Sequence, residues 1–142
     1  MEQKVQHSLV QSLRRIPDFS TLDYSTLLQI VGESMNLFWK AGSVIFEPGA
    51  PGDALYVVLS GEVSITDDGH EVAHMRAGDS FGEMSLLMNA THTKSAHAVT
   101  DSEILVLPKE SFENILETNP TLSEHFHRVA AAKRPRELTR EC

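Results

Sequence analysis

Cysteine and long apolar segments are nearly absent from the sequence. The only cysteine is the last residue, Cys142, so a disulfide framework and a cysteine-based metal site are both excluded. The longest purely apolar run, Ala54–Leu59, has the length of a strand and is far too short to cross a bilayer. The first residues, 1–7, lack the apolar core of a signal peptide. We therefore expect a cytoplasmic protein without membrane insertion.

Positive charge is also scarce. The 142 residues contain 12 Lys and Arg against 20 Asp and Glu, which gives a formal net charge of −8. A nucleic-acid-binding surface needs clustered cations, so this balance predicts that nucleic acid is not a partner. The one basic cluster, 133–136, is typical of a solvated tail. With 41% hydrophobic and 23% charged residues, the chain has the composition of one globular domain.

Helical periodicity marks the N-terminal part of the chain. Apolar residues recur at steps of three and four over 4–16, which predicts a helix with one buried face. A second apolar helical face covers 27–31, and either Asp23 or Ser25 is suited to cap its start. Gly32 lies near the expected end of this second helix.

The period changes to two in the middle of the chain. Short apolar segments separated by Gly-containing turns predict an antiparallel sandwich or barrel rather than a parallel sheet. Residues 67–69, Asp-Asp-Gly, are a strong hairpin signal, and 83–88 form a short helix inside the strand region. The expected strands are 35–39, 44–46, 55–59, 63–66, 72–75, 80–81, 96–100 and 104–107.

The C-terminal part becomes helical again after Pro108. Ser111 is suited to cap one helix, and residues 119–120, Asn-Pro, break it. A final helix is expected from Thr121 until Pro135 stops it. The chain thus reads as one domain, 1–142, with N-terminal helices 1–33, a β-barrel 34–108, C-terminal helices 109–134 and a tail 135–142.

Several short motifs punctuate the strand region. They are Ala41-Gly42 with Ile45-Phe46, the turn 47–53, Leu55–Val58 with Ser60-Gly61, Ala77-Gly78-Asp79, Phe81-Gly82-Glu83 and Thr100-Asp101. In this order and spacing they resemble the cyclic nucleotide-binding domain, the sensor module of the catabolite activator protein, protein kinase A regulatory subunits and cyclic-nucleotide-gated channels. The resemblance covers roughly residues 15–130. The fold that it implies is mainly β with flanking α: an antiparallel jelly-roll β-barrel of about eight strands, a short phosphate-cassette helix and helices at both ends.

The segment that begins Phe-Gly-Glu corresponds to the family's phosphate-binding cassette. Gly82 permits a sharp turn from strand to helix, and a helix start favours an anion through its unpaired N–H groups. By resemblance, backbone N–H groups near Gly82 would face the cyclic phosphate, and Glu83 would accept a hydrogen bond from the ribose 2′-hydroxyl. The implied ligand-binding residues here are Phe81, Gly82, Glu83, Met84 and Ser85.

The phosphate half of the cassette departs from the family pattern. The family has an arginine nine residues after the glutamate, and His92 stands there in the register that needs no insertion. A shifted alignment that places Lys94 at the arginine needs an insertion and a later deletion. Arginine offers a charged fork, whereas histidine offers one donor towards the ligand and is mostly neutral at neutral pH. We expect His92, Thr93 and Lys94 to form the phosphate edge of the site.

Two roles remain open for Lys94. Residues 92, 94 and 96 share one face of an extended segment, so the Lys94 ammonium would be able to reach the same phosphate as His92. Alternatively, Lys94 reaches solvent and the cassette has lost its phosphate contact. The final helix also has two interpretations: Leu122 and Phe126 either close over the base as a lid or pack against the barrel.

The sequence therefore predicts a regulatory module that binds cAMP or cGMP. Binding would act through the C-terminal helix on an effector domain or partner protein outside these 142 residues. The alternative is a degenerate cyclic nucleotide-binding fold that serves as a ligand-independent interaction or regulatory domain. A homodimer through the final helix is a further possibility.

Neither a catalytic nor a metal-binding constellation is evident. Known nucleophile and phosphate-loop motifs are missing, so we expect no enzyme activity and no cofactor. The only His-x-His pair, His125 and His127, lies in the expected final helix, where residues two apart diverge. His70 and His74 flank the hairpin and are expected at the surface.

Overall fold

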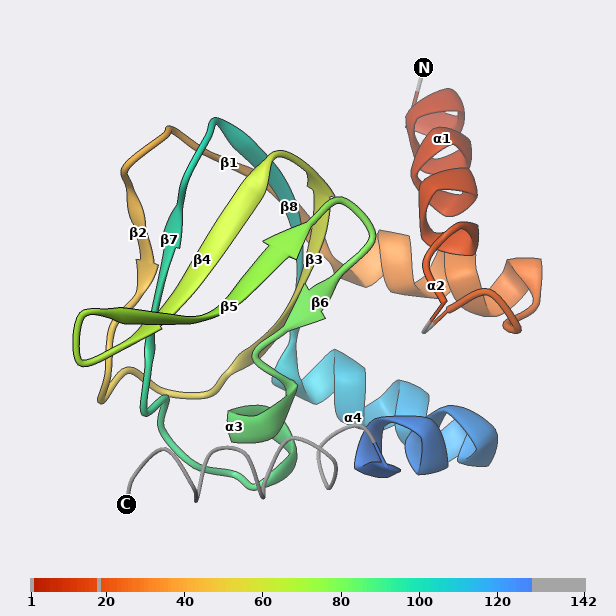
Figure 1. Ribbon diagram of the computed structural model, residues 1–142. Helices are drawn as coiled ribbons and strands as arrows, with labels where there is room; N and C mark the ends of the chain where they lie inside the picture. The colour runs from red at the N-terminus through yellow and green to blue at the C-terminus, as the bar shows by residue number, and fades with distance from the viewer. Residues whose placement is uncertain (1, 18, 129–142) are drawn as a thin grey trace.

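The computed structural model describes residues 2–17 and 19–128. Its eight described strands form two four-stranded sheets, in the orders β1-β8-β3-β6 and β2-β7-β4-β5 (Figure 1). All pairings are antiparallel. The strands are β1 Met35–Trp39, β2 Val44–Phe46, β3 Ala54–Ser60, β4 Glu62–Asp67, β5 His70–Arg76, β6 Ser80–Phe81, β7 Ser95–Ala98 and β8 Ser102–Pro108.

This arrangement confirms the predicted jelly roll with flanking helices. The two sheets face each other without pairing along a common seam among the described strands, so the barrel is open rather than closed. The labelled helices are α1 Glu2–Arg14, α2 Tyr24–Glu33, α3 Glu83–Leu87 and α4 Lys109–Thr118. A further helix occupies 120–128, and its expected continuation to 134 and the tail 135–142 lie outside the described residues.

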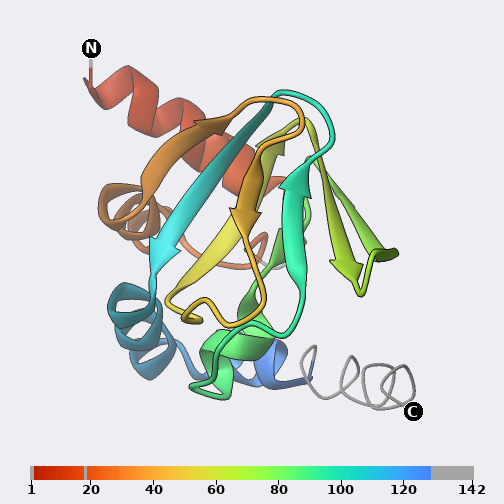
Figure 2. The same cartoon turned by 90° about the vertical axis from the view of Figure 1, so that its left-hand side faces the viewer.

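The helices divide into two groups by position. Figures 1 and 2 place α1, α2 and α4 together on one side of the sheets, whereas the short α3 lies at one end of the jelly roll. No helix in the described part of the chain is long and apolar enough to cross a membrane.

Helix boundaries separate correct local predictions from wrong ones. Asp23 caps α2, with its Oδ1 accepting a hydrogen bond of 2.8 Å from the Thr26 N–H, and this bond lowers the pKa of Asp23. The predicted Ser111 cap is wrong, because β8 runs directly into α4 and Pro108 occupies the cap position. The Lys109 N–H donates instead to the Asp53 carbonyl at 2.8 Å, so a turn across the molecule replaces the side-chain cap.

Strand β3 separates two apolar clusters. Leu55 and Val57 face the helical cluster, which joins one sheet to the helices, while Tyr56 and Val58 face the sheet cluster between the two sheets. A strand buried on both faces has no polar alternation, which accounts for the unbroken apolar run in the sequence.

The final helix is tied into the helical cluster. Leu122 and Phe126 are both buried there, and the Phe126 ring lies 6.0 Å from Phe19 and 5.2 Å from Phe112 between centroids. Of the two roles left open by the sequence, this structure shows the packing role for these side chains. The helix 120–128 thus packs against both the N-terminal helical part of the chain and α4.

Edge strand β1 differs from its predicted alternation. Met35, Leu37 and Phe38 are all exposed, and only Trp39 packs against the sheet cluster. β1 pairs with β8 alone among the described strands and lies at the sheet edge, and the exposure of residues from both of its faces shows that neither face is fully covered.

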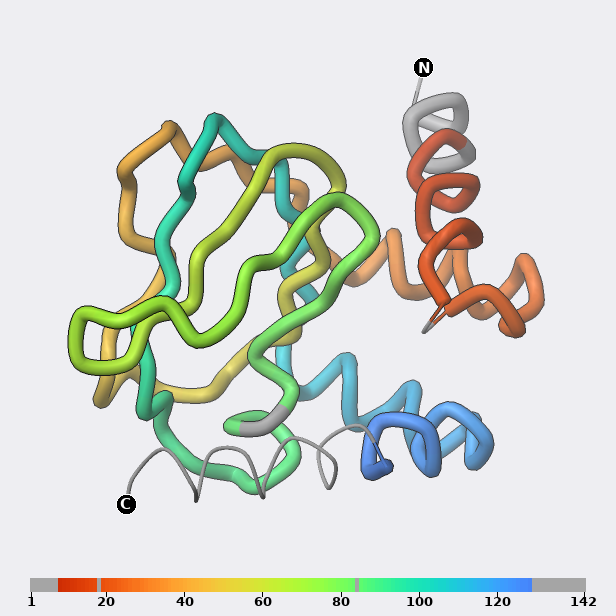
Figure 3. The backbone as a smooth tube through the Cα atoms, viewed as in Figure 1, coloured from red at the N-terminus to blue at the C-terminus, as the bar shows by residue number. Residues whose placement is uncertain are grey.

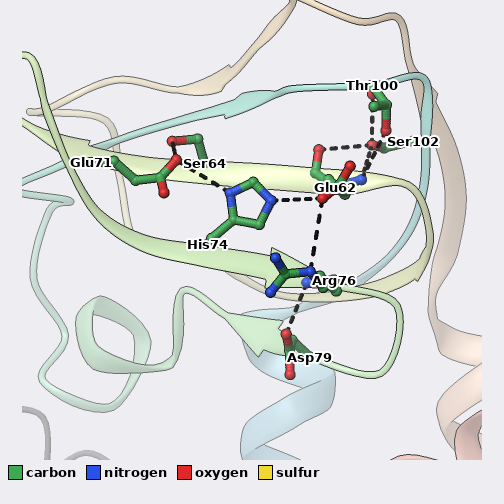
Figure 4. Close-up of polar contacts among 8 residues, drawn as sticks. All are labelled: Glu62, Ser64, Glu71, His74, Arg76, Asp79, Thr100 and Ser102. Atoms are coloured by element: carbon green, nitrogen blue, oxygen red, sulfur yellow. Dashed lines mark hydrogen bonds and ion pairs between the residues drawn. The ribbon is translucent and has the colours of Figure 1, made fainter.

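The β4–β5 hairpin carries a polar network on its outer face (Figure 4). His74 Nε2 lies 2.8 Å from a Glu62 carboxylate oxygen, and Nδ1 lies 3.3 Å from Glu71, which also accepts a 2.6 Å bond from the Ser64 hydroxyl. Hydrogen bonds to Glu62 and then Glu71 raise the pKa of His74. The bond from Ser64, followed by that from His74, lowers the pKa of Glu71. The projecting hairpin is visible in the backbone trace of Figure 3.

Candidate functional site

The candidate site begins where β6 turns into α3. Gly82 has φ of +89°, a left-handed conformation that side chains with a Cβ rarely adopt. A Cβ at this position would also lie 3.0 Å from a ring carbon of Tyr56 and 3.1 Å from the Ala54 carbonyl oxygen. Phe81 fixes the same turn by stacking on Tyr56, with ring centroids 5.0 Å apart. The glycine therefore allows α3 to start directly against β3.

The turn between β2 and β3 is hydrogen-bonded to the loop after α3. The His92 N–H donates to the Ala50 carbonyl at 2.8 Å, and the Gly52 N–H donates to the Ala90 carbonyl at 3.1 Å. A Cβ on Gly52 would lie 2.5 Å from both Ser85 Cβ and the Ala90 oxygen. The sequence predicted the turn 47–53 but not its packing against the loop after α3. The only local signal was the second Pro-Gly pair of the turn, Pro51-Gly52.

Three side chains of ionisable acidic or basic type are buried among the described residues. They are Glu83, His92 and Lys94, with exposed fractions of 1%, 4% and 8%. All three belong to the cassette stretch selected from the sequence. Because proteins rarely bury such groups without a specific interaction, their concentration in one short stretch sets this stretch apart from the ordinary apolar core.

The segment after the cassette loop is not the extended segment that was expected, because residues 93 and 94 form a bend and β7 starts only at Ser95, but its burial still alternates. His92 and Lys94 are buried, whereas Thr93 between them is exposed. The Lys94 ammonium donates to the Thr93 hydroxyl at 3.4 Å. His92 and Lys94 therefore share the interior side, and Thr93 lies towards solvent. Lys94 does not extend into solvent in this structure.

The remaining predicted residues lie in or beside α3. The Ser85 hydroxyl donates to the Thr91 carbonyl at 3.4 Å, and the Ala90 N–H donates to the Ser85 carbonyl at 2.9 Å. Ser85 therefore holds the loop close to its helix. Met84 lies within α3, but its side chain is outside the described part of the structure.

His92 occupies an unusual environment. Its ring stacks on Phe46 with centroids 3.6 Å apart and planes 4° from parallel. Its Nε2 is buried and has no hydrogen-bond partner among the described residues. Burial lowers the pKa of His92, and the Asp53 carboxylate opposes that shift. The imidazole is therefore held neutral, with a ring nitrogen available to a bound group.

Phe46 and Lys109 are site-supporting residues that the sequence did not reveal. Phe46 belongs to a family-like motif, but nothing local predicts that its ring lies on His92. The Lys109 ammonium donates to the Asn89 side-chain oxygen and lies 3.8 Å from Glu113. Asn89 has a positive φ of 54°, consistent with an Asn ending a helical turn. Lys109 thus connects the cassette loop to α4.

The site contains acceptors and donors suited to binding. Glu83 supplies a buried carboxylate, while His92 and Lys94 supply nitrogen donors from the interior side of the neighbouring segment. Among the described residues, His, Cys, Asp and Glu side chains form no group of three or more able to hold a metal ion. The arrangement is chemically suited to a small anionic ligand that also carries a hydroxyl group.

Comparison with known proteins assigns the family. The sequence profile of the cyclic nucleotide-binding domain matches residues 36–119, which include all strands except part of β1 and also the whole candidate site. The chain belongs to the cyclic nucleotide-binding domain family. This match agrees with the fold and with the motifs quoted from the sequence.

Individual relatives place this domain in larger proteins. The cGMP-dependent protein kinase egl-4 of Caenorhabditis elegans is 35% identical over 89 residues, which are 63% of this chain and 11% of the kinase. Among solved structures, cAMP-bound PfPKA-R (141–441) superimposes with a TM-score of 0.87 at 20% identity, covering 96% of this chain and 48% of that one. The regulatory subunit of a cAMP-independent protein kinase A from Trypanosoma brucei gives 0.85 at 22% identity, covering 98% and 50%. The chain therefore spans a small part of that kinase and about half of each structural neighbour.

Proposed function

We propose that the protein is a regulatory module that binds a cyclic nucleotide, cAMP or cGMP, at α3 and the loop behind it. The observation that carries this proposal is the burial of Glu83, His92 and Lys94 together in the stretch that corresponds to the family's phosphate cassette. The proposed ligand-binding residues are Phe81, Gly82, Glu83, Met84, Ser85, His92, Thr93 and Lys94.

Each half of the site has a separate role in this proposal. The Glu83 carboxylate accepts a hydrogen bond from the ribose 2′-hydroxyl, and the backbone around Gly82 approaches the phosphate. His92 Nε2 and the Lys94 ammonium face the phosphate from the opposite segment and together replace one arginine. Thr93 contributes at the exposed edge of this pair.

Binding would be transmitted from the cassette to the C-terminal helices. The Lys109 contact with Asn89 joins the loop to α4, and Phe126 joins the helix 120–128 to the helical cluster. A displaced cassette loop would therefore change the position of α4 and alter a surface read by an effector. In this proposal the module is cytoplasmic, non-catalytic and independent of nucleic acid, cofactor or metal, and its effector is another domain or a partner protein.

The role of Glu83 provides the sharpest test of this function. Calorimetric titration should show that cAMP or cGMP binds and that its 2′-deoxy analogue binds about tenfold or more weakly, because a charge-assisted hydrogen bond is lost. The Glu83→Gln variant should bind the natural ligand more weakly and discriminate less between the pair. The exposed Glu117→Gln is the matched control and should behave as wild type. Equal affinity of wild type for both ligands would contradict the assigned role of Glu83.

A second candidate function is a ligand-independent interaction domain. A neutral His92 at the family's arginine position favours it, and a neighbour with the same fold comes from a cAMP-independent kinase. In this case the buried polar groups would be a remnant of the cassette. Absence of cAMP and cGMP binding at millimolar concentration would support this second function.

A further inference from the structure

We propose that ligand binding is coupled to proton uptake at His92, so that the affinity for a cyclic nucleotide rises as the pH falls. This inference rests on the proposed function and deepens it, because it assigns a pH response to the same site. An arginine at this position would stay charged throughout the physiological range and would give no such coupling.

The geometry keeps the imidazole in place. The ring is stacked on Phe46 at 3.6 Å, and the backbone is fixed on both sides, with the His92 N–H bonded to Ala50 and the His92 carbonyl accepting from Gly49 at 2.8 Å each. Its Nε2 is buried and without a hydrogen-bond partner among the described residues. Protonation without a ligand would therefore place a second N–H and a positive charge where the described residues provide no acceptor.

Burial and a neighbouring carboxylate act on His92 in opposite directions. Asp53, from the turn after β2, favours the imidazolium, and Lys94 is buried two residues further along the same segment. Glu83 of α3 and Tyr56 of β3 are the other titratable side chains buried at this end of the jelly roll. Burial is the largest effect on His92 and lowers its pKa in the free protein.

A bound phosphate reverses this balance. An anionic oxygen near Nε2 would accept a charge-assisted hydrogen bond from the imidazolium and raise the pKa of His92. A cyclic phosphodiester keeps its single negative charge over the whole range in which histidine titrates, so any proton exchanged belongs to the protein. Between the free and bound pKa values, each bound ligand takes up as much as about one proton. The affinity then rises by up to about tenfold for each unit that the pH falls.

The test is calorimetric titration of cAMP and cGMP from about pH 5.5 to 8.5 at constant ionic strength. Repeating each titration in buffers of different ionisation enthalpy counts the protons taken up. Wild type should show a rising affinity at lower pH with matching proton uptake. His92→Arg should bind more tightly at neutral pH and lose the pH dependence, and His92→Gln should bind weakly and also lose it. His74→Gln removes a histidine of the outer face and should keep the wild-type response.

The outcomes separate this inference from the proposed function. Binding with a pH-independent affinity, or a pH dependence that survives in both His92 variants, overturns proton coupling and leaves cyclic nucleotide binding intact. Absence of binding at every pH overturns both. If either variant folds poorly, the pH series and proton count of the wild-type protein still decide the question.

Discussion

The pKa values of two histidines in this protein shift in opposite directions, because His74 is hydrogen-bonded to carboxylates and His92 is buried against an aromatic ring. Hydrogen bonds to Glu62 and Glu71 raise the pKa of His74, whereas burial lowers that of His92. The unfolded chain gives both residues the same reference value of about 6.5. Their contributions to the pH dependence of stability must therefore differ in sign.

His74 contributes stability that is fully present below about pH 6.5 and lost as the pH rises through its folded pKa. His92 has the opposite effect, because the unfolded state binds more protons below about pH 6.5 and stability falls with the pH. Urea unfolding of the free protein measures the unfolding free energy across this pH range. His74→Gln should reduce the loss of stability above about pH 6.5, and His92→Gln should reduce the loss below it. Changes of the same sign in both variants would contradict these environments.

The sequence was sufficient to select the residues of the candidate site but few of their neighbours. The family resemblance placed His92 at the arginine position, and strand parity predicted that Lys94 would share its side. Both side chains are buried, but residues 93 and 94 form a bend, so an extended strand is not the reason. Phe46 stayed unpredicted because its contact with His92 joins distant parts of the chain. Periodicity identifies which face is buried, but it does not identify the partner on that face.

At the scale of elements, the fit between the turn and α3 depends on Gly52. Replacing it with alanine should force the cassette loop away, since the new Cβ would lie 2.5 Å from the Ala90 oxygen. We expect Gly52→Ala to lose about 1–3 kcal/mol of unfolding free energy and to weaken cyclic nucleotide binding. Urea unfolding and calorimetry measure the two effects.

Gly32 supplies the matched control for this substitution. It lies exposed in α2, and a Cβ there would meet nothing within 4 Å. Gly32→Ala should therefore not destabilise the protein and should leave binding unchanged. Because Gly32 lies in the last turn of α2, any gain stays below the about 0.5–1 kcal/mol of a helix interior. Equal behaviour of the two alanine variants would show that the close packing around Gly52 is not present in solution.

The link between the cassette loop and α4 is carried by Lys109. Lys109→Ala removes its bond to Asn89 and the exposed ion pair with Glu113, of which the ion pair contributes little. We expect a loss of about 1 kcal/mol and faster amide exchange in the loop 89–92. The exposed Lys40→Ala is the control and should change neither. Unchanged amide exchange in the loop 89–92 of Lys109→Ala would contradict a role of Lys109 in linking the loop to α4.

Element boundaries show where local sequence signals were overruled by the rest of the molecule. Asp23 is one of the two predicted caps of α2, and it was predictable because the interaction is local, between neighbours in the chain. Ser111 does not cap α4, because the Asp53 carbonyl across the fold already accepts from the first N–H of α4. The exposure of β1 likewise depends on its place at the edge of the fold and on what packs against it, which no alternation pattern specifies.

At the scale of the whole molecule, the strand pattern predicted an antiparallel sandwich or barrel, and the resemblance to the cyclic nucleotide-binding domain specified the jelly roll with helices at both ends. The choice between two separate sheets and a closed barrel was left open, because it depends on which strands pair rather than on any local pattern. Dimerisation through the final helix stays a prediction. Leu122 and Phe126 are already used inside the chain, so a dimer would need other residues of that helix.

Phe126 packs the helix 120–128 against residues from both the N-terminal and the C-terminal helical parts of the chain. Phe126→Ala should cost about 3–5 kcal/mol, because the ring is fully buried between Phe19 and Phe112. The milder Phe126→Leu should cost less and keep the fold for binding experiments. Chemical unfolding measures both, and a loss below about 1 kcal/mol for the alanine variant would contradict the packing role of this helix.

Calorimetric titration of the purified chain with cAMP and with cGMP at about pH 6 tests whether the protein binds a cyclic nucleotide. We expect saturable binding of at least one of them with one ligand per chain. Glu83→Gln should weaken this binding, and His92→Arg should strengthen it at neutral pH by about ten- to a hundredfold. The absence of binding heat and of thermal stabilisation by either ligand at millimolar concentration would contradict this expectation.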